Sequence, residues 1–558
     1  MAADAAFFWL LLSALATLPA LRASWRSLRR AEIACLGSLV ALAWWLRAWV
    51  VAPSILRGHY NGYEHLAATL RVVEGHDLPM EAFLPGHGVL LSWVNVVCRL
   101  DLDRWFAVDI ALGVLAVPVA FLAIWRWTGD ATDALVGGAL VAVDPAHVRF
   151  SASEDPMPLI ALCAWFMLLG TALHGRDRQP SGAWLAAGAL GFAIATKAEG
   201  LLLGVGFGAL WWSAHSGAGP VLSPRARYAI GAGLALLVAS LALPLLRSRG
   251  YMANPQYGGM RLASYAQHVA ELPLGMLLHN PLGDPRYAAP AVTALVLVGL
   301  VTGCARRDRV VLACLAFLAV LFVRIYEDFP LPFDERVTRE APRWFFRHWF
   351  HSRMGAGVKG DVRWNLHAMV PWTLLAVAGA RWIRERVRAP WVLAALVIAG
   401  GATFVTTRGW WRHRWADQRE ADLLTRAARA LPIPCAIVLP RDVPAQGPVV
   451  RHAQPLKLLD VVDPRWRDTP RVLQDEGDVP PELRRCAVYY RGLSCYVWEP
   501  DVPLDPQRTE HDGCSARFSD PGMAPIDGLV ERFAYEDYSN FEVIARAVTL
   551  GFYRVRTP

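Results

Sequence analysis

The stretch WFAVDIALGVLAVPVAFLAIW, residues 105–125, is almost entirely apolar and is followed directly by Arg126. A helix of about 20 apolar residues crosses the hydrocarbon core of a membrane. The chain is 55% hydrophobic, whereas soluble proteins are about 45–50% apolar. The sequence therefore predicts a polytopic α-helical membrane protein with about 12 transmembrane helices. The other predicted spans are 5–21, 32–53, 134–148, 157–173, 182–196, 199–213, 228–246, 289–305, 309–323, 365–380 and 390–407.

Arginines cluster in every second connection between these spans. Cytoplasmic loops carry an excess of Lys and Arg, so this alternation predicts a multi-pass protein of the plasma (inner) membrane with both termini outside. The first span lacks a basic leader and a cleavage site, which indicates a retained helix. The net charge of +8 is then a topology signal, and no nucleic-acid partner is expected. The clustered arginines are Arg22, Arg26, Arg29, Arg30, Arg126, Arg176, Arg178, Arg225, Arg227, Arg306, Arg307, Arg309, Arg381, Arg384, Arg386 and Arg388.

A long outer loop is predicted at 54–104. Its segment HGVLLSWVNVVCRL, residues 87–100, is short and contains Asn95. If this segment crossed the membrane, every later arginine cluster would change sides, so we expect a juxtamembrane or re-entrant helix. Earlier in the loop, Tyr63, Leu66, Leu70 and Val73 recur at helical spacing and predict an amphipathic helix on the membrane surface.

After Thr407 the chain becomes polar. We expect a transmembrane domain at 1–407 and a small extracytoplasmic α/β domain at 408–558, in which ADQREADLLTRAARALP predicts a helix and CAIVLP, GPVV, CAVYY and GFYRVR predict strands. The domain contains Cys435, Cys486, Cys495 and Cys514. Outside the cell these four could form two disulfides in any of three pairings, or they could remain buried thiols.

Two acidic sites fall on the predicted outer face. Glu64 lies in YNGYEH, and Glu154 and Asp155 lie in SASEDP. Carboxylates at a membrane boundary can gain the proton affinity that a general base needs. They could also hold a divalent metal, Mg or Mn, against a phosphate. No other cofactor is expected.

A basic, aromatic outer loop at 324–364 contains Arg347, Arg353 and Arg363. Guanidinium groups interleaved with aromatic rings could bind a lipid phosphate, or they could attract anionic membrane lipids without a specific site. Charges within spans are costly. Snorkelling to the surface explains Arg47, whereas Asp109 and Lys197 open toward the outer loops and could line one cavity.

Five segments together resemble the GT-C superfamily of polyprenyl-phosphate-sugar glycosyltransferases, which includes protein mannosyltransferases, lipid A aminoarabinose transferases and oligosaccharyltransferase catalytic subunits. They follow the order of that family over about the first 380 residues. The segments are NGYEHLAATLRVVEGHDLP, FLPGHGVLL, VDPAHVRFSASEDP, GFAIATKAEGLLLG and VRWNLHAMVPWTLLAVAG.

The resemblance implies that Glu154 and Asp155 form the second acidic site of the family. At the first site Asn61 stands where related families have an aspartate, which leaves Glu64 as the nearest carboxylate for the general base. The implied reaction moves a sugar from a polyprenyl-phosphate donor to a lipid, glycan or protein acceptor of the cell envelope. The transfer takes place at the outer face of the plasma (inner) membrane, with inversion at the anomeric carbon.

The resemblance also implies which residues bind the donor phosphate. Lys197 matches a Thr-Lys element of the family, and Arg363 matches a basic residue before the last core helix. His87 falls where the family often has His-Pro-Pro, although the prolines are missing here. The basic loop adds Arg347 and Arg353.

Two other functions remain open. In a transporter or flippase of lipid-linked intermediates, Arg47, Asp109 and Lys197 would line a path through the bilayer, but the internal repeats common in transporters are absent from the sequence. The departure at Asn61 instead fits a family member that binds glycans without catalysing transfer.

Overall fold

The computed structural model describes two compact units of the chain. Helices α1 to α19 belong to the first unit, and the elements from α21 to β5 belong to the second. The described residues are 2–26, 28–51, 69, 72–73, 85–100, 102–197, 200–215, 223–247, 290–327, 366, 368–387, 398, 400, 416–439, 456–466, 471–472, 479–496, 510, 512–537 and 544–556.

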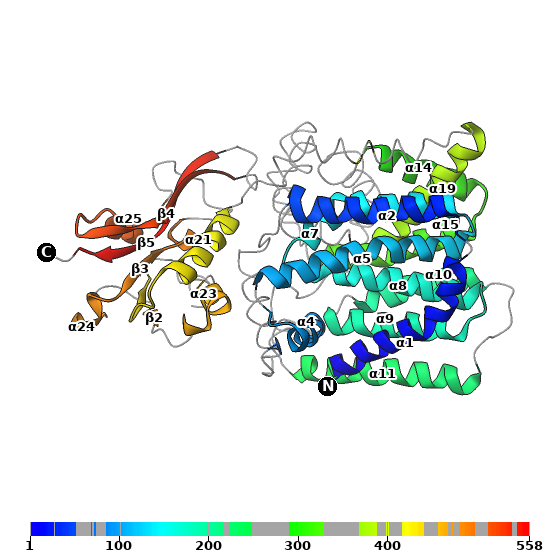
Figure 1. The fold of residues 1–558 in the computed structure, drawn as a ribbon, viewed down its shortest axis with the longest axis horizontal. Helices are drawn as coiled ribbons and strands as arrows, with labels where there is room; N and C mark the ends of the chain where they lie inside the picture. Colours follow the sequence, from blue (N-terminus) through cyan, green and yellow to red (C-terminus); the bar gives the residue numbers. More distant parts are fainter. Residues whose placement is uncertain are drawn as a thin grey trace, which may run out of the picture. The chain divides into compact units, whose positions relative to one another are not determined.

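The first unit is helical (Figure 1). Its elements are α1 (Ala2–Trp25), α2 (Arg30–Trp45), the π-helix η1 (Leu46–Val51), α4 (Gly86–Val97), α5 (Leu102–Thr128), α6 (Ala131–Val143), α7 (Pro145–Ser151), α8 (Met157–Gly175), α9 (Pro180–Thr196), α10 (Gly200–His215), α11 (Pro224–Arg247), α14 (Pro290–Ala305), α15 (Arg309–Glu327) and α19 (Met369–Val387).

Four helices in the described part of the chain are long and apolar enough to cross a membrane. They lie at Ala2–Arg22, Arg30–Val51, Asp103–Thr128 and Met157–Gly175. Several shorter apolar helices accompany them, and the chain is a multi-pass membrane protein. The predicted span 390–407 lies almost entirely outside the described residues.

The core of the helical unit is built around α8, which packs against α5, α9 and α10 (Figure 1). Nearly every residue of α8 is buried. Two helix pairs approach closely through glycines: a Cβ at Gly170 of α8 would lie 2.5 Å from the carbonyl oxygen of Gly182 in α9. A Cβ at Gly299 of α14 would overlap the Leu375 carbonyl of α19. Close backbone approach through small residues is how helices associate in a membrane.

Arginines of different arginine-rich connections meet at one end of the helical unit. Arg126 at the end of α5 lies 3.3 Å from Asp177 after α8. Arg384 near the end of α19 lies 2.5 Å from Asp130 before α6. These ion pairs place the arginine-rich ends of α5, α8 and α19 together, in keeping with the alternation in the sequence. That this end is cytoplasmic stays a prediction.

The predicted span 134–148 is wrong at its end. The helix α6 stops at Val143, because Asp144 leaves the helical conformation (φ −62°, ψ 118°) and Pro145 follows it. The Oδ1 atom of Asp144 then accepts a hydrogen bond of 2.7 Å from the backbone N–H of His147 and caps a new helix, α7. The segment before the predicted second acidic site is therefore a short helix.

The segment at 87–100 forms a helix, α4, as expected. With 12 residues at 1.5 Å each it is about 18 Å long, which is too short to cross a core of about 30 Å. Of the amphipathic helix predicted before it, only Thr69, Val72 and Val73 are described, and all three are helical. The rest of that prediction lies outside the described residues.

The second unit contains a five-stranded sheet of order β2-β1-β3-β5-β4 (Figure 1). Strand β1 pairs in parallel with β2 and β3, and β5 pairs antiparallel with β3 and β4. Its elements are α21 (Ala416–Ala430), β1 (Ile437–Val438), α23 (Lys457–Val462), β2 (Arg471–Val472), α24 (Pro481–Arg484), β3 (Val488–Arg491), α25 (Asp512–Phe518), β4 (Met523–Asp537) and β5 (Ile544–Val555).

Helix α21 is amphipathic and contacts β4 and β5. Leu423, Leu424, Ala427 and Ala428 form its buried face. The same face carries the buried Glu420, whose Oε1 accepts hydrogen bonds from the Tyr490 hydroxyl (2.6 Å) and from the Leu493 backbone N–H (2.8 Å). These bonds satisfy a carboxylate that would otherwise be costly to bury.

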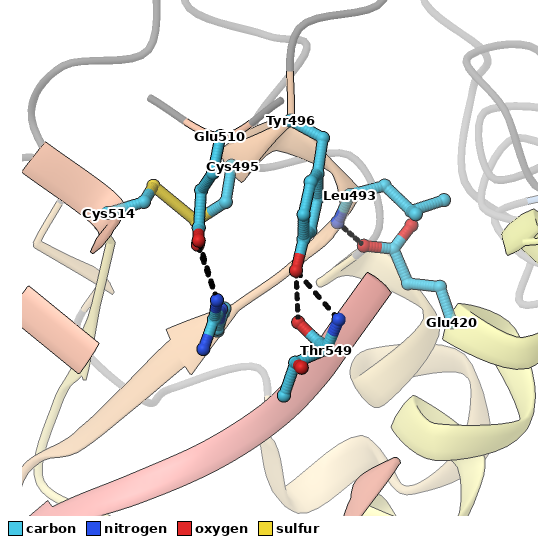
Figure 2. The surroundings of a disulfide bond; sticks show 8 residues. Glu420, Leu493, Cys495, Tyr496, Glu510, Cys514 and Thr549 are labelled. Atoms are coloured by element: carbon cyan, nitrogen blue, oxygen red, sulfur yellow. Dashed lines mark hydrogen bonds and ion pairs between the residues drawn. A yellow bond between two sulfur atoms is a disulfide. The ribbon is translucent and has the colours of Figure 1, made fainter. Parts of the chain in front are cut away.

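The four cysteines of this unit form two disulfides, Cys435–Cys486 and Cys495–Cys514. Figure 2 shows the second disulfide and the neighbouring Tyr496. The Tyr496 hydroxyl accepts a hydrogen bond from the backbone N–H of Thr549 (2.7 Å) and donates one to the carbonyl oxygen of Thr549 (3.1 Å). Burial raises the pKa of the Tyr496 phenol. The disulfide thus lies next to a side chain that anchors the loop after β3 to β5.

Candidate active site

Buried charged side chains gather at the end of the helical unit that is opposite the arginine-rich end. In Figure 1, α4 and α7 lie at this end. Successive helices run in opposite directions. The same end therefore also holds η1, the start of α5, the break between α6 and α8, and the end of α9. The buried polar side chains here are Arg47, His87, Asp109, His147, Arg149, Ser151, Ser153, Glu154 and Asp155.

His87 and Asp109 are in direct contact. Nε2 of His87 in the first turn of α4 lies 2.9 Å from Oδ1 of Asp109 in α5. The indole of Trp105, one turn before Asp109, lies edge-on to the imidazole, with the ring centroids 5.8 Å apart. The sequence predicted that Asp109 opens toward the outer loops. The structure pairs it with His87, one of the residues expected to bind phosphate.

Glu154 and Asp155 lie in the turn between α7 and α8, and both are buried, with 0% and 2% of their surface exposed. Oδ1 of Asp155 accepts a hydrogen bond of 3.0 Å from the backbone N–H of Met157, the first residue of α8. Its carboxylate is close enough to Asp109 for electrostatic repulsion, while Glu154 attracts Arg149. The turn is thus enclosed by protein and is not a solvated loop.

The backbone of α4 abuts the end of α9. A Cβ at Gly86 would come within 2.5 Å of the Thr196 hydroxyl and 2.7 Å of the Thr196 nitrogen, so only glycine allows this approach. The next residues in each segment are His87 and Lys197. The structure therefore brings these two predicted phosphate-binding residues to neighbouring positions.

Val72, in the predicted outer loop at 54–104, lies against α4. A Cβ at Gly88 of α4 would come within 2.8 Å of Val72, which lies eight residues after Glu64 in the sequence. Glu64 itself lies outside the described residues, as do Asn61, Arg347, Arg353 and Arg363. Their predicted roles stay predictions.

The described residues contain no group of three His, Cys, Asp or Glu side chains that could hold a metal ion. Asp109 interacts electrostatically with Asp155 as well as with His87, and Arg149 interacts with Glu154. Imidazole and carboxylate side chains such as these are residue types that can hold and move protons.

Sequence analysis missed three side chains of this cluster. Asp144, His147 and Arg149 all lie in VDPAHVRFSASEDP, of which only the two final acids were singled out. The signal was available, because a polar Asp-Pro between apolar stretches predicts a helix break. Arg47 was interpreted as snorkelling to the surface, but the structure buries it completely.

No protein-family model matches the chain, and no curated protein matches it. Among solved structures, the chain is similar to the oligosaccharyltransferase of Archaeoglobus fulgidus in complex with Zn and sulfate, with a TM-score of 0.45 and 13% identity over 76% of this chain and 61% of that one. The chain thus spans about three-fifths of the length of that protein.

It is also similar to ArnT from Cupriavidus metallidurans. The apo structure matches with a TM-score of 0.45 and 15% identity over 94% of this chain and 98% of that one. The structure bound to undecaprenyl phosphate matches with a TM-score of 0.43 and 15% identity over 83% and 94%. The solved structures to which this chain is similar thus include an oligosaccharyltransferase and ArnT.

Proposed function

We propose that the chain is an integral membrane glycosyltransferase that moves a sugar from a polyprenyl-phosphate donor to a lipid, glycan or protein acceptor at the outer face of the membrane. The observation that carries this proposal is the collection of buried acids at one end of the helical unit. Asp109, Glu154 and Asp155 lie there with His87, away from the arginine-rich end. Hydrophobic packing alone requires none of these side chains.

The proposed reaction has an inverting course. Glu64 takes the proton of the acceptor hydroxyl while the acceptor oxygen bonds to the anomeric carbon, and the bond from that carbon to the phosphate oxygen breaks. Lys197, His87 and Arg363 offset the charge that develops on the leaving phosphate, with Arg347 and Arg353 nearby in sequence. Asn61 holds the position of a first acidic residue, and Glu154 and Asp155 form the second acidic site. No step is assigned to a metal ion.

The orientation is part of the proposal. Disulfides persist in oxidising compartments outside the cytoplasm, and the second unit has two of them. These disulfides support an extracytoplasmic location for the domain at 408–558, and we propose the same for the loops that carry the acids. The arginine-rich end then faces the cytoplasm, as the distribution of Lys and Arg in membrane proteins requires.

The test is transfer by the purified full chain from radiolabelled polyprenyl-phosphate sugars. Wild type should transfer the label, and Asp155→Asn and Glu64→Gln should reduce transfer by about 10²-fold or more. Asp103→Asn changes an exposed acid in the first turn of α5 and should retain full transfer. Equal transfer by Asp155→Asn and wild type would remove the second acidic site from the reaction.

Two other outcomes would identify a different function. Donor binding without turnover by wild type would indicate a non-catalytic glycan-binding protein. Asn61 favours this alternative, because it stands where related families have an aspartate. Movement of a labelled lipid across vesicle membranes, again without sugar transfer, would indicate a flippase.

A further inference from the structure

We infer that Arg47 is a positioning residue: its guanidinium fixes α7 in place and thereby fixes the turn that presents Glu154 and Asp155. The inference deepens the proposed function and rests on it for the role of the two acids. The positioning itself is a property of the fold that can be measured without any reaction.

Arg47 lies in the π-helix η1, and its side chain is completely buried. One guanidinium nitrogen, Nη1, donates to the carbonyl oxygens of Ala43 (3.0 Å) and Ala142 (3.2 Å). The other, Nη2, donates to the carbonyl oxygen of Val141 (3.3 Å). Two of these acceptors belong to the last turn of α6. A single side chain thus joins the end of α2 to the end of α6.

The end of α6 needs such a donor. In a continuing helix the Val141 carbonyl would accept from the backbone N–H four residues later, but that residue is Pro145, which has none. Orphan carbonyls at a buried helix end are costly. The Arg47 guanidinium supplies the missing donors, and its positive charge also interacts favourably with the negative end of the helix dipole.

The same guanidinium holds α7. Nη2 of Arg47 lies 2.7 Å from Nδ1 of His147 in the first turn of α7. Arginine only donates, so His147 accepts through Nδ1 and carries its own proton on Nε2. At the other end of α7, Ser151 lies against α5 at Gly113, where a Cβ would overlap the Ser151 hydroxyl and lie 3.1 Å from Nε of Arg47.

The acidic turn follows directly from α7. The Ser153 hydroxyl donates to the carbonyl oxygen of Phe150 in α7 (2.7 Å), and the backbone N–H of Asp155 donates to the Ser153 hydroxyl (3.3 Å). The turn is thus tied to α7, and α7 is held at both ends. Loss of the Arg47 contacts should therefore loosen the turn that carries Glu154 and Asp155.

The experiment measures the exposure of the turn. Ala152, between α7 and the two acids, is fully buried. An Ala152→Cys chain in detergent should react slowly with a water-soluble maleimide at this position, with its labelling separated by peptide mapping from that of the exposed Cys35, Cys98 and Cys304. Adding Arg47→Gln should raise the labelling rate of Cys at this position by about tenfold or more, because local opening controls access to a buried group. Arg47→Lys should give an intermediate rate, since one ammonium cannot reach every acceptor of the planar guanidinium.

Two further variants keep the result decisive. Arg126→Gln removes an arginine from the opposite end of the helical unit, and it should leave the labelling rate unchanged. If Arg47→Gln does not yield a monodisperse protein, Gly113→Ala replaces it, because its Cβ displaces Ser151 without removing a charge. Unchanged labelling in Gly113→Ala and in the soluble arginine variants would overturn the inference.

Activity separates this inference from the proposed function. Arg47→Lys should lower kcat for sugar transfer and leave KM for the donor within about twofold, because Arg47 is not among the residues proposed to bind phosphate. Increased labelling in a protein whose wild type transfers no sugar would support the positioning role and reject the proposed function. A raised donor KM with unchanged labelling would instead make Arg47 a donor contact and overturn the inference.

Discussion

Nε2 of His87 lies 2.9 Å from Oδ1 of Asp109, and the exposed fractions of the two side chains are 1% and 3%. The contact joins α4, which is too short to span the membrane, to the long helix α5. Because both groups are buried, neither can exchange its partner for water.

Removal of the carboxylate should therefore destabilise the protein. Asp109→Ala leaves the His87 ring nitrogen without a partner and should lower the free energy of unfolding by about 1–3 kcal/mol. Asp109→Asn can still hydrogen-bond and should cost less. Thermal unfolding in detergent measures both effects, with Asp103→Asn as an exposed control on the same helix. A midpoint for Asp109→Ala equal to that of wild type would show that the contact contributes nothing.

The four cysteines of the second unit could pair in three ways, and the structure shows one of them, Cys435–Cys486 with Cys495–Cys514. Non-reducing digestion followed by mass spectrometry should find these two linked peptides. The bridged cysteines are 51 and 19 residues apart, so loss of the first bridge should cost about 4 kcal/mol and loss of the second about 3 kcal/mol. Detection of either other pairing would contradict the arrangement in Figure 2.

The pair between Asp130 and Arg384 should make stability depend on pH. Partial burial raises the pKa of Asp130, but hydrogen bonds from Arg384 and from the backbone N–H of Thr132 outweigh burial, and the pKa is lowered overall. An acid with a lowered pKa contributes stability that is fully present above its unfolded pKa, about 3.9, and is lost as the pH falls through the folded value.

Unfolding of wild type and Asp130→Asn should be compared from pH 7 downward. The stability difference between them should be constant near neutral pH and should shrink below about pH 4. A difference that persists unchanged in acid would mean that the carboxylate is not bound as described.

Gly299 and Gly379 should tolerate no side chain. A Cβ at Gly299 would overlap the Leu375 carbonyl, and a Cβ at Gly379 would overlap the Leu295 carbonyl. Gly299→Ala should therefore push α14 away from α19 and destabilise the protein by about 1–3 kcal/mol. Gly208→Ala is the matched control, because an added Cβ there meets nothing within 4 Å. A neutral effect at Gly299 would show that the two helices are packed less closely.

Much of the helical unit could be predicted because its signals are local. The apolar stretch at 105–125 lies within α5, and the arginine alternation anticipated that Arg126 and Arg384 would meet at one end. Helix α21 could be predicted from its spacing of apolar residues. In each case the residues that carry the signal are also the residues that form the element.

The site could be predicted only in part. A lone charge such as Arg47 in an apolar stretch has the same local signature whether it snorkels or binds carbonyls. Two of its three carbonyl acceptors, Ala142 and Val141, are 95 and 94 residues away in the sequence. The predicted span 134–148 ran through Asp144, although the Asp-Pro pair there indicates a helix break. The disulfide pairing depends on distances in space, which sequence spacing does not fix.

The two ends of the helical unit are held by contacts of different kinds. In the Arg306–Glu385 pair the side chains are 56% and 50% exposed, whereas Arg47 and His147 are sealed from solvent. Dissolved ions weaken attraction between exposed charges and hardly reach enclosed ones. Rising ionic strength should therefore loosen the arginine-rich ends of α14 and α19 first, while the acidic turn on the far side keeps its shape.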